Sequence, residues 1–174
     1  MSTSLLKKLK EAAYLEGHFV TRSGKETTYY IDKYLFETRP EILGPLAKEL
    51  AALFPDPSTY DVIAAPELGA VALAAVVSLE LQKPFVIVRK ETKGYGTKRL
   101  VEGKLDPGSR VVVLEDILTT GGAVLAACDV LVRSGAVIQQ LVGVLNRQEG
   151  AFENIQKQGY SVTALFTTSD LQSC

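Results

Sequence analysis

From residue 60 onward, short and nearly continuous apolar runs alternate with segments of helix length, and this alternation constrains the fold more than any other feature. Strands that are covered on both faces have such runs, because the side chains on both sides of the strand enter apolar layers. The runs occupy residues 61–65, 85–88, 111–114, 137–145 and 160–166. The helix-length segments between most of them are residues 69–82, 121–134 and 149–157. Strand–helix–strand repetition predicts an α/β fold in which helices flank a parallel sheet.

The residues before position 60 follow a different pattern. Leucines and alanines at helical spacing predict an amphipathic helix over residues 4–15, which Gly17 ends. An aromatic strand is predicted over residues 28–34, followed by a helix over residues 40–53 that opens with a proline. A chain of 174 residues can bury one core and carry a small appendage of this kind.

The composition narrows the class of protein. Hydrophobic residues make up 47% and charged residues 22%, which is typical of a soluble globular protein. With 19 basic and 20 acidic residues, the chain lacks the positive excess that general nucleic-acid binding requires. The two cysteines are too few for a disulfide framework and favour a reducing, cytoplasmic setting. The longest apolar run, residues 70–79, is too short to span a membrane, so we expect neither a membrane nor a nucleic acid as partner.

Residues 89–104 interrupt the alternation and show no apolar periodicity. This insert carries six basic residues and two acidic ones in a chain that is otherwise slightly acidic. A long unpatterned segment in a compact domain is usually a mobile lid or a disordered loop. The local positive charge favours a flexible lid that meets an anionic ligand, and a solvated hairpin with incidental lysines is the alternative.

The most informative segment is residues 111–123, a buried strand that ends in Glu115 and Asp116 and continues into a turn of threonines and glycines. A helix is predicted to begin near Gly121. The first turn of a helix offers unpaired amides and a positive dipole end to a phosphate, and glycine lets the backbone approach the anion closely. Two carboxylates at the end of a strand can accept hydrogen bonds from a sugar diol or help to hold a divalent cation.

These features predict a ligand with a phosphate at one end and hydroxyl groups nearby, as in a ribose 5-phosphate. The alternative is that Glu115 and Asp116 cap the following helix while the glycines only form a tight turn. That interpretation explains one acidic residue but not a pair beside a run of threonine and glycine.

Residues 111–123 closely resemble the phosphoribosyl pyrophosphate (PRPP) signature of the type I phosphoribosyltransferases. That signature consists of a hydrophobic strand, two acids, two variable residues and Thr-Thr-Gly-Gly. Three further stretches resemble the orotate phosphoribosyltransferase family in particular, and the resemblance extends over nearly the whole chain. They are Ser23–Lys25 with Tyr29–Asp32, then Val86–Glu91 with Lys93, Gly94 and Gly96, and finally Asn146–Gly150.

The resemblance implies an N-terminal hood over the base in residues 1–40 and a phosphoribosyltransferase core in residues 41–174. It implies catalytic roles for Arg89, Lys90 and Lys93 of the lid and for Asp116. The PRPP-binding residues that it implies are Lys25, Arg89, Lys90, Lys93, Tyr95, Glu115, Asp116, Ile117, Leu118, Thr119, Thr120, Gly121, Gly122 and Ala123. Residues 66–69 follow the first core strand, where relatives place a pyrophosphate-binding turn.

The resemblance also implies which residues meet the base. Orotate is a flat ring with a carboxylate, and an arginine fork can hold a carboxylate through two hydrogen bonds. Arg147 is the candidate for this contact, with Thr119 as a second orotate-binding residue. The alternative for Arg147 is an exposed arginine at the end of a strand.

The expected activity is transfer of the phosphoribosyl group from PRPP to orotate, with Mg²⁺ as cofactor. The metal is expected to bind through the PRPP rather than through a dedicated set of protein ligands. In this family the lid of one subunit serves the site of its neighbour, so a homodimer is expected.

The chain departs from many relatives at four positions. Tyr95 stands where a histidine is common, and a tyrosine can donate a hydrogen bond but carries no positive charge. Asn146 replaces an aspartate, and some relatives have a lysine at Glu26 and another near Leu68. His18, the single histidine, lies outside the insert and is expected to be a surface or packing residue.

Two other functions fit part of the pattern. A phosphoribosyltransferase for another base, such as a purine, would share the signature but would not need Arg147 and the N-terminal aromatic segment. A phosphoribosyl-sensing regulator that binds RNA or DNA would need a broad basic face, and outside the insert the charges are near balance or acidic.

Overall fold

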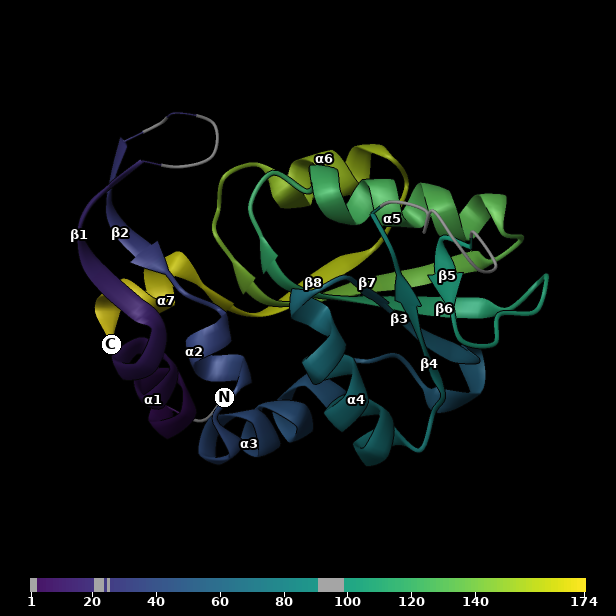
Figure 1. The fold of residues 1–174 in the computed structure, drawn as a ribbon, viewed down its shortest axis with the longest axis horizontal. Coiled ribbons are helices and arrows are strands. Elements are labelled where there is room, and N and C mark those ends of the chain that lie inside the picture. Colours follow the sequence, from purple (N-terminus) through teal and green to yellow (C-terminus); the bar gives the residue numbers. More distant parts are fainter. Residues whose placement is uncertain (1–2, 21–23, 25, 91–98) are drawn as a thin grey trace.

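The computed structural model describes residues 3–20, 24, 26–90 and 99–174, and its centre is a sheet of six strands (Figure 1). Every pair of neighbouring strands is parallel except β4 and β5, which are antiparallel. In their order across the sheet, the strands are β5 (Val101–Glu102), β4 (Phe85–Val88), β3 (Val62–Pro66), β6 (Arg110–Leu118), β7 (Val137–Asn146) and β8 (Val162–Thr167). The predicted strands are confirmed, and β5 is an addition at the edge.

Helices cover both faces of the sheet, as the strand–helix alternation predicted. Figure 1 shows α5 (Gly122–Arg133) and α6 (Ala151–Lys157) on one face, with α3 (Pro40–Ala51) and α4 (Gly69–Leu81) on the other. Of these, α4, α5 and α6 connect consecutive parallel strands. The α/β fold with a helix-flanked parallel sheet is therefore confirmed.

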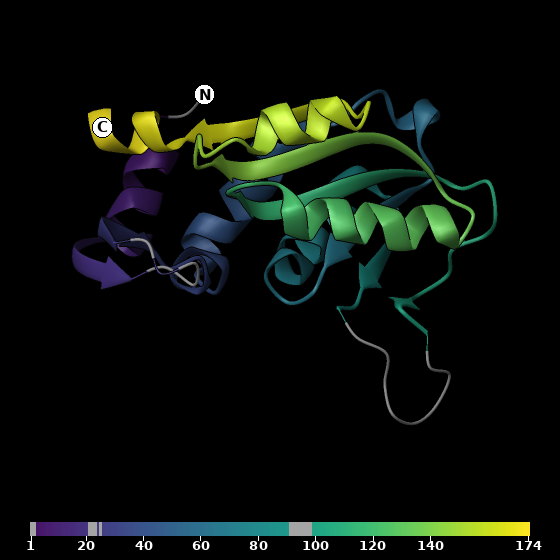
Figure 2. The same cartoon turned by 90° about the horizontal axis from the view of Figure 1, so that it is seen from above.

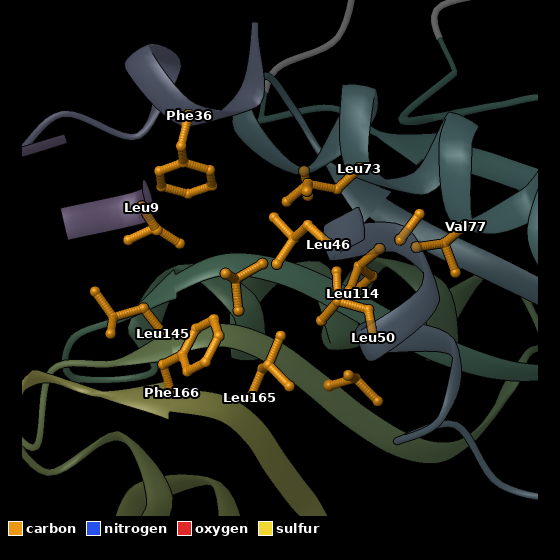
Figure 3. Packing of buried hydrophobic residues seen from close by; sticks show 14 of the residues in the cluster. Leu9, Phe36, Leu46, Leu50, Leu73, Val77, Leu114, Leu145, Leu165 and Phe166 are labelled. Atoms are coloured by element: carbon orange, nitrogen blue, oxygen red, sulfur yellow. The ribbon is translucent and has the colours of Figure 1, made fainter. Parts of the chain in front are cut away.

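The strand β6 shows why the apolar runs are nearly continuous. Its side chains alternate between faces, so Val112 and Leu114 enter the core beneath α3 and α4, while Val111 and Val113 enter the core beneath α5. Figure 3 shows the first of these cores, in which leucines of α3 and α4 pack against Leu114. Because both faces are covered here, the run from Val111 to Leu114 contains no polar residue.

The N-terminal region differs from the sequence prediction in two elements, a strand and a short helix. Helix α1 (Thr3–Ala13) ends earlier than predicted, and β1 (Tyr14–Val20) pairs with β2 (Glu26–Ile31) in a separate antiparallel hairpin. Most residues of β1 are exposed, so this strand lacks the apolar alternation by which a strand is recognised. The short helix α2 (Tyr34–Glu37) then leads from the hairpin into α3.

The C-terminal helix α7 (Thr168–Ser173) was also not predicted. It packs against α1, as Figure 2 shows, and Lys10 Nζ donates a hydrogen bond to the carbonyl of Cys174 over 2.7 Å. The N-terminal region is thus held from two sides, by the core and by α7. Among the helices that the structure describes, none has both the length and the apolar character needed to cross a bilayer.

Candidate active site

A cavity of about 460 Å³ lies where β3, β4 and β6 end. From this point β3 leads into α4 on one face of the sheet and β6 leads into α5 on the other, which is the kind of crevice where open α/β sheets bind ligands. The lining residues are Lys33, Pro66, Glu67, Val88, Arg89, Lys90, the run from Glu115 to Val124, Ala126, Ala127 and Val130. The signature segment and the start of the basic insert therefore share one cavity.

The turn after β6 presents the start of α5 to this cavity. Gly121 precedes the helix with φ of 84°, a conformation that favours glycine, and a Cβ there would lie 3.3 Å from the Ala151 carbonyl oxygen. Asn154 of α6 donates a hydrogen bond to the Thr120 carbonyl over 3.0 Å, which ties the turn to α6. Because the first amides of a helix have no partner within it, this turn is suited to binding a phosphate.

Glu115 and Asp116 lie on the cavity wall and are nevertheless almost fully buried, with 8% and 2% exposure. Asp116 accepts hydrogen bonds from the Ile117 amide at Oδ1 and from Lys33 Nζ at Oδ2, each over 2.5 Å. Glu115 Oε1 accepts a longer bond of 3.3 Å from the Asp116 amide. Gly121 caps α5 with no side-chain hydrogen bond in the described chain, so the interpretation of the acids as helix caps is wrong.

The charge of Glu115 depends on its surroundings. Burial, and then the neighbouring charge of Asp116, raises the pKa of Glu115 well above its usual value. The folded protein therefore shifts Glu115 toward its neutral form. Within the described residues, Glu115 Oε2 is buried and has no hydrogen-bond partner, so one oxygen of the pair is left for a ligand.

Two basic residues of the insert lie at the end of β4, beside Glu67. The Lys90 amide donates to Glu67 Oε1 over 2.8 Å, and Arg89 Nη1 lies 3.6 Å from Glu67 Oε2. All three residues line the cavity, as does Pro66, so the predicted turn of residues 66–69 contributes its first two residues to the wall. The basic residues Arg89 and Lys90 therefore line the cavity from the end of β4, and the acid pair lines it from β6.

Arg147 lies at the end of β7, next to the last residue of β6. Its amide donates to the Leu118 carbonyl over 2.8 Å, and its Nη2 lies 3.0 Å from Glu149 Oε1 and 3.4 Å from the Tyr29 hydroxyl. Its guanidinium lies over the Tyr29 ring, which in turn stacks on Tyr14. Arg147 Nε is buried and, in the part of the chain that the structure describes, has no partner.

The comparisons with known proteins agree with this geometry. Residues 39–161 match the phosphoribosyl transferase domain family. The chain is 42% identical over 173 residues to an orotate phosphoribosyltransferase of Pyrococcus abyssi, and the matched region covers 98% of this chain and 95% of the relative. The chain belongs to the orotate phosphoribosyltransferase family.

Solved structures of orotate phosphoribosyltransferases have the same fold. The enzyme of Aeropyrum pernix superposes with a TM-score of 0.86 at 30% identity, over 99% of this chain and 97% of that one. A Mycobacterium tuberculosis orotate phosphoribosyltransferase in complex with PRPP superposes with a TM-score of 0.76 at 26% identity, over 98% of each chain.

Most residues that the orotate phosphoribosyltransferase resemblance selected can be placed. Those from Glu115 to Ala123, together with Arg89 and Lys90, line the cavity, and this group includes Thr119. Arg147 adjoins the end of β6 but is not among the cavity-lining residues in the described chain. The three remaining residues, Lys25, Lys93 and Tyr95, lie outside the described residues.

Sequence reasoning missed Lys33. This lysine follows β2, lines the cavity and forms the ion pair with Asp116, whose side chain is 3% exposed. Burial lowers its pKa, but the hydrogen bond and charge of Asp116 outweigh that effect, so the pKa of Lys33 is raised overall. The only sequence signal was its position directly after the Tyr29–Asp32 stretch of the family resemblance.

Proposed function

We propose that this chain transfers the 5-phosphoribosyl group from PRPP to orotate, giving orotidine 5'-monophosphate and pyrophosphate in pyrimidine biosynthesis. The observation that carries the proposal is the cavity in which a helix-start phosphate site adjoins a buried acid pair. Relatives named orotate phosphoribosyltransferase over nearly the whole chain, one of them solved in complex with PRPP, support it.

The phosphate and the ribose take neighbouring places in this proposal. The 5-phosphate binds the amides of the Thr119–Ala123 turn, where glycine permits close approach. The ribose hydroxyls meet Glu115 and Asp116 at the end of β6. The free oxygen of Glu115 supports this arrangement, because a buried unpaired oxygen is costly until a donor satisfies it.

Orotate is placed between Thr119 and Arg147. The Nε of Arg147 is a buried donor without a partner among the described residues, which supports an anionic ligand at this position. Stacking on Tyr29 restricts the guanidinium, so less conformational freedom is lost when it binds a carboxylate. A purine lacks this carboxylate, so the proposal favours orotate over other bases.

The basic insert is proposed to act on the leaving group. Pyrophosphate departure concentrates negative charge, and Arg89, Lys90 and Lys93 are proposed to stabilise it, with Tyr95 and Lys25 as further PRPP contacts. Closure of the insert would also exclude water from the reacting carbon. We further propose a homodimer in which the insert of one subunit serves the partner's site.

Mg²⁺ is the proposed cofactor. The oxygen donors of the acid pair are of the kind that this hard cation takes, and they border the cavity into which PRPP would carry it. Since a pair of carboxylates is too small a set for a complete coordination shell, the remaining ligands would come from PRPP and water. When bound, the metal supplies positive charge that offsets the charge of the pyrophosphate.

We also propose that residues 1–40 act as a hood over the base and residues 41–174 as the catalytic core. The stacking of Tyr14 on Tyr29, next to Arg147, supports a hood that reaches the base site. The cytoplasm is the proposed location, which is consistent with two free cysteines.

Orotate consumption tests the main proposal. Purified protein with Mg²⁺ and PRPP should reduce the ultraviolet absorbance of orotate, and heat-denatured protein should not. An active preparation that consumes adenine or another base but not orotate would replace the proposal with a different phosphoribosyltransferase. Binding of PRPP without turnover of any base, together with RNA or DNA binding, would favour the regulator instead.

Mixed dimers test the shared insert. Lys93→Ala and Asp116→Asn should each lose most activity as homodimers, because each removes one part of every site. Mixing the two after reversible unfolding should restore activity, because some hybrid dimers combine an intact insert with an intact acid pair. No recovery in hybrids that are shown to form would mean that each insert serves its own subunit.

A further inference from the structure

Lys33 makes an ion pair that joins two distant segments of the chain. It follows the hairpin of β1 and β2, and its Nζ lies 2.5 Å from Oδ2 of Asp116 at the end of β6. The Asp116 side chain is 3% exposed and that of Lys33 is 30% exposed, so the acid is enclosed while the lysine still borders the cavity. Removing one partner of such a pair leaves a buried charge uncompensated.

The ion pair packs directly on the backbone at the start of α4. A Cβ built on Gly69 would lie 1.6 Å from Asp116 Oδ2 and 2.5 Å from Lys33 Nζ, which are impossible contacts. Gly69 therefore leaves the space that the two charged groups fill. With the Ile117 amide on the other oxygen, the Asp116 carboxylate is held on three sides.

A second acid near Lys33 does not compete with Asp116. Glu37 lies one helical turn after Lys33 and is 3% exposed, and its Oε1 has no hydrogen-bond partner among the described residues. Burial, then the charge of Asp116, raises the pKa of Glu37 to about 8, against the opposing effect of Lys33. Glu37 is therefore neutral at pH 7, and the charge of Lys33 is directed to Asp116.

We propose that Lys33 is a positioning residue for ribose recognition, which fixes the Asp116 carboxylate against Gly69 and neutralises its charge. This inference rests on the proposed function, because it assigns the ribose to the acid pair. Lys33 acts through Asp116 and makes no required contact with the pyrophosphate. Its neutralising charge also keeps Asp116 from repelling the polyanionic substrate.

A double-mutant cycle on substrate binding tests this inference. The variants are K33M, D116N and the double variant, and the ligands are PRPP, ribose 5-phosphate and pyrophosphate, each with Mg²⁺ and measured by calorimetry. K33M should weaken PRPP and ribose 5-phosphate by about tenfold to hundredfold, the usual range for a lost hydrogen bond to a charged group. In the D116N background, K33M should add no more than about a twofold loss, because partners in one interaction are not additive.

Two further variants separate positioning from general stability. K33R, which keeps the charge, should recover part of the affinity, whereas K48M removes an exposed lysine of α3 and should bind like the parent protein. Circular dichroism and thermal unfolding check that each variant is folded. If K33M fails to fold, K33Q, which keeps a donor of similar length without the charge, carries the same cycle.

The outcomes are distinct. Unchanged affinity in K33M, or losses that multiply in the double variant, would overturn the role of Lys33. The role of Lys33 would also be overturned if K33M lost as much affinity for free pyrophosphate as for PRPP, since Lys33 would then be a ligand of the leaving group. A parent protein that binds PRPP but consumes no orotate would contradict the proposed function while the cycle still decides on Lys33.

Discussion

Arg147 lies across the face of Tyr29, with the guanidinium carbon 5.2 Å from the ring centroid. Tyr14 stacks on the other side of Tyr29 at a centroid distance of 5.2 Å and an interplanar angle of 8°. A cation above an aromatic ring is attracted by the ring's quadrupole, and the second ring stiffens the first. The N-terminal hairpin therefore sets the orientation of an arginine that belongs to the core.

Replacement of Arg147 should affect one substrate more than the other. In R147A the Michaelis constant for orotate should rise by about tenfold to hundredfold, because a charge-assisted pair of hydrogen bonds is lost. The constant for PRPP should change by less than about twofold. R133A, which removes an exposed arginine from α5, is the matched control in steady-state kinetics. Equal changes for both substrates would remove Arg147 from orotate recognition.

Substitution by alanine should have different effects at Gly69 and at Gly44. G69A should weaken PRPP binding by at least about tenfold, because its methyl group displaces the Asp116 carboxylate. G44A lies in α3, where a Cβ would meet no atom beyond its chain neighbours, and it should leave PRPP binding unaltered; because Pro45 follows it, no gain in stability is expected. Calorimetry and chemical denaturation measure the two effects, and normal binding by G69A would show that the acid pair tolerates the shift.

Glu37 should make stability depend on pH. Its pKa of about 8 in the folded protein lies above the ordinary value of 4.5, so between these values the folded state holds a proton that the unfolded state releases. The stabilisation is complete below pH 4.5 and is lost as the pH rises to about 8, at up to about 1.4 kcal/mol per pH unit. E37Q has no such proton, so its advantage over the parent protein in free energy of unfolding should grow across this window. Parallel curves for the two proteins would contradict the buried neutral acid.

Asp61 should make an opposite contribution at acidic pH, far from the cavity. Its hydrogen bonds from Arg110 lower the pKa of Asp61 to about 2, below the ordinary value of 3.8. The folded state therefore gains stability above pH 3.8 that is lost as the pH falls through about 2. D61N should reduce the acid sensitivity of thermal unfolding and leave turnover unchanged. A change in turnover would mean that this end of the sheet is coupled to the cavity.

The parts of the fold that could be predicted are those in which burial produces a local pattern of apolar residues in the sequence. The run from Val111 to Leu114 is apolar because both of its faces are covered, and the acids follow where the strand reaches the cavity. β1 could not be predicted, because its residues are largely exposed and follow no burial period. The two residues of β5 are too few to produce any pattern at all.

The candidate site also has a part that could be predicted from the sequence and a part that could not. The phosphate turn and the acid pair are contiguous in sequence, so their chemistry can be recognised before the fold is known. Lys33 and its partner are 83 residues apart, and they meet where both pack on Gly69. A single lysine after an aromatic strand gives no signal in the sequence that this contact will form.

The antiparallel pairing of β4 with β5 determines how the basic insert is attached. The Arg89 amide donates to the Leu100 carbonyl over 2.8 Å, so the two ends of the insert are fastened to each other at the margin of the sheet. Substitutions between those ends should therefore alter catalysis while the sheet and its two cores stay folded.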